Sequence, residues 1–393
     1  MISVNEASDI INGRLFKPTI EVVGLHTALN RICAEEVVAD RDFPPFNRVA
    51  MDGICIQYHD YQKGQREFKI VGTQPAGAKA LENQRGCAIE IMTGAMLSRH
   101  ADSVIRYEDL SIVNGIATIS IDDVRQGQNV HKQGSDRKKG DILISKNSLI
   151  TPTEIGVLAT VGKQTVPVYT NPKVAIVSTG DELVNVNETP LSHQIRKSNV
   201  HTLKALVQQH GIEPELVHLA DDKSAITCKI GVLLKDKDVI LMSGAVSKGK
   251  FDFLPEVLAD LGVVKHFHKV EQRPGKPFWF GITESTSVFA FPGNPVSTFT
   301  CAKRFFEPWL KKSLHQDPRQ HYAFLAEEVS FKPNLTYFLQ VLVENNHGKL
   351  VAQPVKGNGS GDLANLTLAN ALMELPANQT HFEEGSVHPI WWF

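Results

Sequence analysis

Three short turns near the middle of the chain carry residue types that could bind phosphate. Residues 178–183 read Ser-Thr-Gly-Asp-Glu-Leu, residues 243–249 read Ser-Gly-Ala-Val-Ser-Lys-Gly, and residues 291–297 read Phe-Pro-Gly-Asn-Pro-Val-Ser. Glycine lets the backbone approach a ligand closely, and the N-terminus of a following helix presents free N–H groups to an anion. Three such turns at one edge of a sheet predict a site for a phosphate-rich ligand. For any one turn alone, an ordinary strand-to-helix turn with a capping serine remains the alternative.

Carboxylates accompany these turns. Asp181 and Glu182 lie within the first turn, and Asp252 follows the second by three residues. Asp221 and Asp222 stand at the start of a predicted helix. Acidic groups beside an anion site suit a hard divalent cation, most simply Mg²⁺. For Asp221 and Asp222, capping of the helix N-terminus is the alternative.

A basic segment follows at residues 269–277, where Lys269, Arg273 and Lys276 surround a Pro-Gly turn. Cations held in a fixed geometry suit an oxyanion or a phosphate. The alternative is a solvated hairpin with exposed charges.

The spacing of apolar residues predicts the elements that must position these turns. Continuous apolar runs at 174–177 and 239–242 are typical of strands buried on both faces. Helical spacing between and after them predicts a doubly wound α/β domain. Alternating patterns over 54–121 and from about residue 321 predict a β-rich segment and a small C-terminal β domain. The Ser3-to-Glu6 spacing of a capping box predicts an N-terminal helix.

The composition excludes several classes of protein. Lys plus Arg is 41 and Asp plus Glu is 43, a net charge of -2, so we expect no nucleic-acid partner. The five cysteines are odd in number and form no Cys-x-x-Cys pair, which indicates a reducing compartment. The longest charge-free apolar stretch contains two prolines and is too short to span a bilayer, so we expect no membrane partner. We therefore predict a soluble cytoplasmic protein.

Seven segments in order carry a resemblance to a known family. They are 43–53 (Phe-Pro-Pro-Phe-Asn-Arg-Val-Ala-Met-Asp-Gly), 91–95 (Ile-Met-Thr-Gly-Ala), 178–183, 195–199 (Ile-Arg-Lys-Ser-Asn), 243–249, 273–277 (Arg-Pro-Gly-Lys-Pro) and 291–297. Together they resemble the MoeA-type molybdopterin molybdenumtransferases, which are related to the C-terminal domain of gephyrin. The resemblance covers nearly the whole chain.

This resemblance implies a multidomain α/β fold and an elongated homodimer. A discontinuous dimerisation domain would comprise residues 1–39 and 139–169, and a β-rich domain carrying Met-Asp-Gly would comprise residues 40–138. A MogA-like doubly wound domain with the active site would comprise residues 170–314. A small β barrel would comprise residues 315–393.

The resemblance also implies a reaction, in which molybdate is inserted into adenylylated molybdopterin and AMP is released with the help of Mg²⁺ or Zn²⁺. The molybdopterin adenylyltransferase is then a candidate partner. The implied catalytic residues are Asp52, Asp136, Asp252, Lys269, Arg273 and Lys276, and the implied metal ligands are Glu182 and Asp252. The implied binding residues are Thr93, Thr179, Gly180, Asp181, Ser198, Asp222, Ser243, Gly244, Ser247, Pro292, Gly293, Asn294 and Pro295. In the family, the counterparts of Asp52, Thr93 and Asp136 come from the partner subunit.

The chain departs from the family pattern at several positions. Ala245 replaces a second glycine, Ser135 replaces a glutamate and Val49 replaces a serine. Lys248 replaces an apolar residue, and Arg273 replaces the lysine of some members. Two alternatives to a molybdenumtransferase stay open. One is a diverged, catalytically impaired paralogue that acts as a pterin-binding or scaffold protein. The other is a related adenylyltransferase, although such enzymes are normally a single α/β domain without a Met-Asp-Gly segment.

Overall fold

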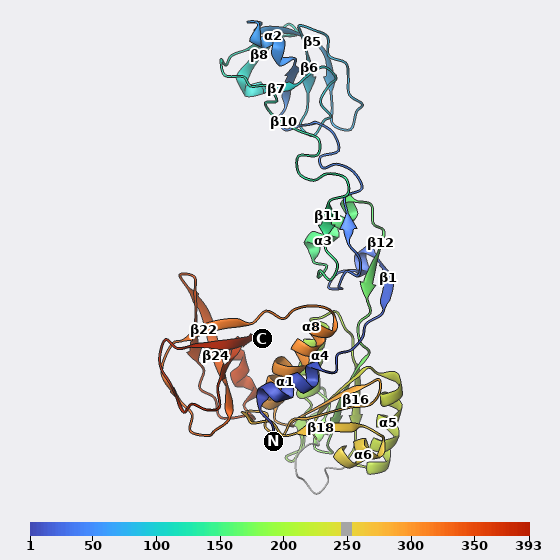
Figure 1. The fold of residues 1–393 in the computed structure, drawn as a ribbon, viewed down its shortest axis with the longest axis vertical. Helices are drawn as coiled ribbons and strands as arrows, with labels where there is room; N and C mark the ends of the chain where they lie inside the picture. Colours follow the sequence, from blue (N-terminus) through green and yellow to red (C-terminus); the bar gives the residue numbers. More distant parts are fainter. Residues whose placement is uncertain (245–253) are drawn as a thin grey trace. The chain divides into compact units, whose positions relative to one another are not determined.

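The computed structural model describes residues 1–244 and 254–393, and the chain forms two compact units (Figure 1). The first unit comprises Met1–Ala34, Asn147–Pro152 and Thr165–Phe393. The second comprises Glu35–Lys146 and Thr153–Gln164. Each unit is thus assembled from segments that are separated in the sequence.

A six-stranded sheet in the first unit has the order β16-β13-β17-β21-β20-β18. Its strands are β13 (Val174–Thr179), β16 (Glu215–Leu219), β17 (Val239–Ser243), β18 (Val264–His268), β20 (Trp279–Ile282) and β21 (Ser287–Phe291). Every residue of β13, β17 and β21 is buried, as the continuous apolar runs predicted. The first four strands in the order are parallel, whereas β20 and β18 are antiparallel to their neighbours. The short connection from β20 to β21 accounts for their antiparallel pairing, because parallel neighbours need a long crossover.

Helices cover both faces of this sheet. α5 (Lys223–Asp236) and α6 (Leu254–Asp260) share one core with Ala175 and Val177 of β13. The other core contains Val174 and Ile176 together with residues of four further helices: α1 (Val4–Asn12), α4 (Asn199–Gln208), α7 (Pro295–Cys301) and α8 (Glu307–Ser313). Alternate residues of β13 therefore face opposite cores, which confirms the doubly wound α/β fold. A π-helical segment, η3 (Ala302–Phe306), joins α7 to α8.

The N-terminal helix α1 begins with the predicted capping box. The Ser3 hydroxyl accepts a hydrogen bond from the Glu6 amide at 3.2 Å, and the Ser3 amide donates to the Glu6 carboxylate at 2.7 Å. Each bond satisfies a backbone N–H that the first turn of a helix leaves without a partner.

The C-terminal part of the first unit is a closed five-stranded barrel. Its strands are β22 (His321–Leu325), β24 (Thr336–Asn346), β25 (Lys349–Pro354), β26 (Ala371–Leu375) and β28 (Val387–Trp392). The order β24-β25-β22-β28-β26 closes through pairing of β26 with β24, which confirms the predicted small barrel. The short strand β19 (Gln272–Arg273) runs parallel to β24 and attaches the basic segment to the barrel. Smaller elements flank the barrel: β23 (Val329–Ser330), β27 (His381–Phe382) and η4 (Leu363–Leu368).

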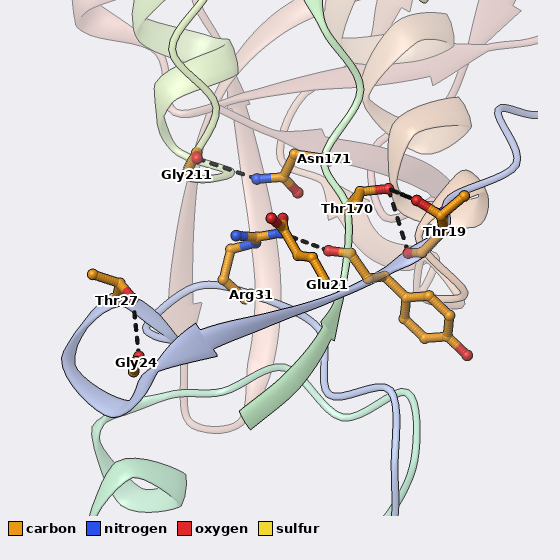
Figure 2. Close-up of polar contacts among 9 residues, drawn as sticks. Thr19, Glu21, Gly24, Thr27, Arg31, Thr170, Asn171 and Gly211 are labelled. Atoms are coloured by element: carbon orange, nitrogen blue, oxygen red, sulfur yellow. Dashed lines mark hydrogen bonds and ion pairs between the residues drawn. The ribbon is translucent and has the colours of Figure 1, made fainter. Parts of the chain in front are cut away.

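An antiparallel ribbon joins the N-terminal part of the first unit to the segment that returns from the second. It pairs β1 (Ile20–Gly24) with β12 (Thr165–Tyr169). Figure 2 shows the polar contacts of this ribbon, in which the Arg31 guanidinium forms an ion pair with Glu21 and donates to the Tyr169 carbonyl at 2.7 Å. One partly buried cation thus links two strands that lie far apart in the sequence.

The second unit contains a six-stranded sheet in the order β7-β4-β6-β5-β9-β8. Its strands are β4 (Gly53–Ile56), β5 (Glu67–Gln74), β6 (Cys87–Ile91), β7 (Ser103–Arg106), β8 (Leu110–Val113) and β9 (Ile116–Ile119). These strands confirm the β-rich character predicted for residues 54–121. Short ribbons and helices complete the unit: β2 (Val37–Val38), β3 (Arg48–Val49), β10 (Val130–His131), β11 (Ile142–Ile144), α2 (Tyr58–Gln62) and most of α3 (Pro152–Thr160).

Across residues 1–244 and 254–393, no helix combines the length and the apolar character that crossing a bilayer requires.

Candidate functional site

The described parts of the three predicted turns, residues 178–183, 243–244 and 291–297, meet at one edge of the first unit's sheet. Ser178, Ser243 and Phe291 lie in register on β13, β17 and β21, so their strands end side by side. Gly244 has φ +95°, and a Cβ there would lie 3.5 Å from the Thr179 carbonyl oxygen. A Cβ on Gly293 would lie 3.8 Å from the Gly244 Cα. The three turns thus lie in van der Waals contact, with the positive φ of Gly244 favouring glycine there, and we call this place the sheet edge.

The first turn brings a free carboxylate to the sheet edge. Gly180 has φ +129°, and the Glu182 carboxylate occupies the space that a Cβ at this position would need. The Glu182 carbonyl accepts from the Ile195 amide at 2.9 Å, but within the described ranges its carboxylate forms no hydrogen bond or ion pair. Its oxygens are therefore available to a cation or a solvent molecule.

The neighbouring aspartates are engaged in local hydrogen bonds. Asp181 Oδ1 accepts from the Asp221 amide at 3.2 Å. Asp222 caps α5, because its Oδ1 accepts from the Ala225 amide at 2.7 Å. For Asp222 the structure thus shows the capping contact that the sequence left as an alternative.

Asn199, which the sequence reasoning did not single out, ties two of the turns together. Its Nδ2 donates to the Ser243 hydroxyl at 2.7 Å and to the Gly293 carbonyl at 2.7 Å. Ser198, a predicted binding residue, is the N-cap of α4 and makes no capping bond through its side chain. No local pattern signals the role of Asn199, because its two partners are 44 and 94 residues away.

A histidine lies beside the first turn. The Ser178 hydroxyl and His218 Nδ1 are 3.0 Å apart. Burial, followed by the positive charge of Lys197, lowers the pKa of His218 below its usual value. The imidazole is therefore predominantly neutral at pH 7, and the sheet edge gains no positive charge from it.

Two buried side chains support residues 273–276, which we call the basic turn. Gln272 Nε2 donates to the Pro274 carbonyl at 3.1 Å, and the Cys301 thiol donates to the Gly275 carbonyl at 3.6 Å. Burial raises the pKa of Cys301, so the thiol keeps its proton. With both carbonyls bound inward, the turn has a fixed conformation.

The charged residues of the basic segment occupy different places. Arg273 and Lys276 line a cavity of about 900 Å³, together with Pro292 and Asn294 from the third turn. Lys269 has φ +80°, which non-glycine residues rarely adopt, and its amide donates to the Phe278 carbonyl at 2.9 Å. Arg273 and Lys276 thus meet the third turn at one cavity, whereas Lys269 does not line it, and both cavity-lining cations keep exposed side chains.

The cavity lies between the α/β domain and the barrel. Asn294 Nδ2 donates to the Ser360 hydroxyl at 2.7 Å, and the Val296 amide donates to the Ser360 carbonyl at 3.1 Å. These bonds and the β19–β24 pairing hold the two walls together. Its volume is within the range of sites that bind small molecules and cofactors.

Three further predicted residues belong to the second unit. Asp52 Oδ1 accepts from the Thr93 amide at 2.6 Å, and this bond lowers the pKa of Asp52. Asp136 Oδ1 lies 2.8 Å from His131 Nε2, while Arg48 lies 3.1 Å from His131 Nδ1. Because arginine is always a donor, His131 Nδ1 must accept and Nε2–H must donate to Asp136. Asp52 and Thr93 are thus in contact, and Asp136 is oriented by a histidine that the sequence did not single out.

Two predicted residues, Ser247 and Asp252, lie outside the described residues, as do Ala245 and Lys248. Among the residues that are described, no group of three or more His, Cys, Asp or Glu side chains is arranged to hold a metal ion. Mg²⁺ usually binds through one or two carboxylates and completes its shell with water and ligand phosphates. The free carboxylate of Glu182, beside the glycine-containing turns of the sheet edge, fits that pattern.

Three family models match almost the whole chain. The MoeA N-terminal region (domain I and II) matches residues 2–162, the "Probable molybdopterin binding domain" matches residues 175–312, and the MoeA C-terminal region (domain IV) matches residues 322–393.

Individual proteins of other organisms are also similar to this chain over most or all of its length. A molybdopterin molybdenumtransferase from Synechocystis is 37% identical to this chain, and the alignment covers the full length of both proteins. One from Bacillus subtilis is 33% identical over 93% of this chain and 88% of its own length. The crystal structure of a molybdopterin biosynthesis MoeA protein from Pyrococcus horikoshii matches all of both chains with a TM-score of 0.84 and 28% identity.

Proposed function

Because this chain belongs to the MoeA family of molybdopterin molybdenumtransferases, we propose that it inserts molybdate into adenylylated molybdopterin and releases AMP. It is an enzyme of molybdenum cofactor biosynthesis. One observation carries the detailed proposal: Pro292 and Asn294 of the third turn and Arg273 and Lys276 of the basic turn line one cavity of about 900 Å³, within the range of cofactor sites.

The sheet edge would bind the diphosphate of the substrate. Gly180, Gly244 and Gly293 allow close approach of the backbone, and Asn199 keeps two of the turns together. Thr179 and Ser243 supply hydroxyl groups at the ends of their strands, and Ser247 would add another. The contacts of Asp181 and Asp222 with neighbouring amides support a role in shaping the turns.

The basic turn would bind molybdate. Arg273 and Lys276 flank a turn whose carbonyls are bound inward, so their charges are presented together at the cavity. A tetrahedral dianion gains more from two preorganised cations than a monoanion does. Lys269 would add positive charge from the start of the same segment.

Glu182 and Asp252 would hold a divalent cation, Mg²⁺ or Zn²⁺. Such an ion, when bound, supplies Lewis-acid stabilisation of charge on phosphate and molybdate oxygens. The support in this chain is the unpaired Glu182 carboxylate beside Gly180.

We propose a homodimer in which Asp52, Thr93 and Asp136 complete the site of the other subunit. Ile20 and Val22, on one face of β1, are 57% and 65% exposed, and Val38 and Ile142 on the β2–β11 ribbon are exposed as well. Apolar side chains left in water on paired strands support a covering subunit. The four-domain division, a cytoplasmic location and the adenylyltransferase as a partner are parts of the same proposal.

The direct test is reconstitution of the cofactor from adenylylated molybdopterin. With molybdate and Mg²⁺, the protein should release AMP and yield a product that activates a molybdenum-free molybdoenzyme. Tight binding of the nucleotide without release of AMP would favour a non-catalytic paralogue instead. Lys235 is an exposed lysine on α5 that forms no ion pair with described residues. The control variant Lys235→Ala should therefore keep full activity.

A further inference from the structure

The two walls of the cavity differ in charge and in chemistry. Lys276 and Asn294 lie on the wall formed by the α/β domain, whereas the wall formed by the barrel carries Glu327, Glu328, Phe331 and Tyr337 and also Lys356. The geometry points to the barrel wall as the subsite for the pterin ring of the substrate. This inference rests on the proposed function and adds the direction in which the substrate would lie.

The aromatic residues of the barrel wall are arranged to accept a flat ring. Phe331 and Tyr337 are stacked with their centroids 4.3 Å apart and their planes 10° apart. The Arg273 guanidinium lies 5.9 Å from the Phe331 centroid. Tyr337 is only half-buried, so the stack continues to the cavity. Aromatic faces and guanidinium planes are surfaces on which heteroaromatic rings stack.

The carboxylates of the same wall favour a pterin ring over an adenine ring. Glu327 and Glu328 form no hydrogen bond or ion pair with any described residue, and both line the cavity. An ionised carboxylate only accepts hydrogen bonds. A pterin offers it two adjacent donors, the 2-amino group and the ring N3–H. Adenine offers an amino group beside a ring nitrogen that accepts, so it fits a carboxylate less well.

The charges also fix the orientation of the substrate. The two carboxylates Glu327 and Glu328 outnumber the Lys356 ammonium on the barrel wall and would repel the diphosphate and the dithiolene, whereas Lys276 on the opposite wall would attract them. The pterin ring then lies against the barrel, and the phosphates extend toward the sheet edge. The bonds of Ser360 to Asn294 and Val296 keep the two walls at a constant separation.

The test compares two small probes that differ at one position. 6-Hydroxymethylpterin carries the 2-amino group, and 6-hydroxymethyllumazine carries an oxygen there. Both are titrated into the full-length protein and followed by their own fluorescence. We expect the pterin to bind at least about tenfold more tightly, the effect of one charge-assisted hydrogen bond. In the double variant Glu327→Gln and Glu328→Gln, this preference should fall to about twofold or less.

Matched variants separate this inference from a loss of structure. Glu344→Gln alters an exposed carboxylate on β24 that does not line the cavity, and it should keep the full preference. Each single variant is titrated as well, and at least one should lose most of the preference. Equal binding of the two probes by the wild type, or a preference that survives in the double variant, would overturn the subsite. Failure of both probes to bind while AMP still binds would also overturn it but would leave molybdenum insertion intact. If AMP neither binds nor is released, the proposed function itself fails.

Discussion

Gly275 shows how closely single residues are constrained around the basic turn. It has φ +90°, and a Cβ there would lie 2.5 Å from Gln272 Nε2 and 2.6 Å from Cys301 Sγ. Both neighbours are fully buried, so neither can move aside at low cost.

We therefore predict that Gly275→Ala lowers the free energy of unfolding by about 2–4 kcal/mol, since left-handed backbone strain and overpacking add together. Gly262→Ala is the matched control. Gly262 has φ +82°, but nothing lies within 4 Å of its added Cβ, so this variant should lose about 1–2 kcal/mol. Urea unfolding measures both variants, and equal losses would show that the contacts with Gln272 and Cys301 do not matter.

His218 gives a prediction about pH. Burial lowers its pKa in the folded protein, so the unfolded chain binds its proton more readily. The resulting contribution to stability is present above the unfolded pKa of about 6.5 and is lost as pH falls through the folded pKa. His266 and His388 have pKa values lowered by burial in the same direction. The free energy of unfolding should therefore fall between pH 7.5 and pH 5.5, and it should fall less in His218→Gln. An identical decrease in the variant would remove His218 from this pH dependence.

The first residue of helix α4, Asn199, links this helix to the sheet edge. Asn199 Nδ2 donates to groups on both β17 and the turn after β21. Aspartate has nearly the same shape but no N–H donor, and its charge would face the Gly293 carbonyl.

Asn199→Asp should therefore weaken AMP binding about tenfold, the value of one or two lost hydrogen bonds. Asn171→Asp is the matched control, because Asn171 donates to the Gly211 carbonyl at 3.2 Å in the ribbon region of Figure 2. The control should lower stability without changing AMP affinity, as titration calorimetry and thermal melts would show. If the two variants bind AMP equally, Asn199 does not organise the site.

The elements themselves were largely predictable, but the contacts that organise the site were not. The buried runs at 174–177 and 239–242 predicted strands because burial on both faces leaves a continuous apolar signal. Strand β19 and the support of the basic turn by Cys301 had no such signal, since Gln272 and Cys301 are 29 residues apart and meet only in the folded chain. The antiparallel direction of β18 and β20 was not predicted, because apolar spacing does not encode strand direction. The resemblance to the family supplied Asp52, Thr93 and Asp136, whose place in the second unit no local pattern predicts.

At the level of the assembled protein, the proposal of a shared site can be tested by mixing two defective variants. Asp52→Asn alters the second unit and Lys276→Ala alters the first. In a mixed dimer, one of the two sites would combine an intact Lys276 with an intact Asp52. After subunit exchange, the mixture should recover about a quarter of wild-type activity, because half of the dimers are mixed and each has one intact site. No recovery, although sedimentation shows exchange, would mean that each subunit forms its site alone.

The molybdate dependence of AMP release in Lys276→Ala tests the proposed chemistry most directly. Lys276 lines the cavity at a turn whose carbonyls are bound inward. The variant should need roughly ten- to a hundredfold more molybdate for half-maximal release, because a charge-assisted bond to the oxyanion is lost. Its affinity for the nucleotide should change much less, since the sheet edge supplies many other contacts. A collapse of nucleotide affinity with an unchanged molybdate dependence would contradict this and would place the basic turn at the phosphates instead.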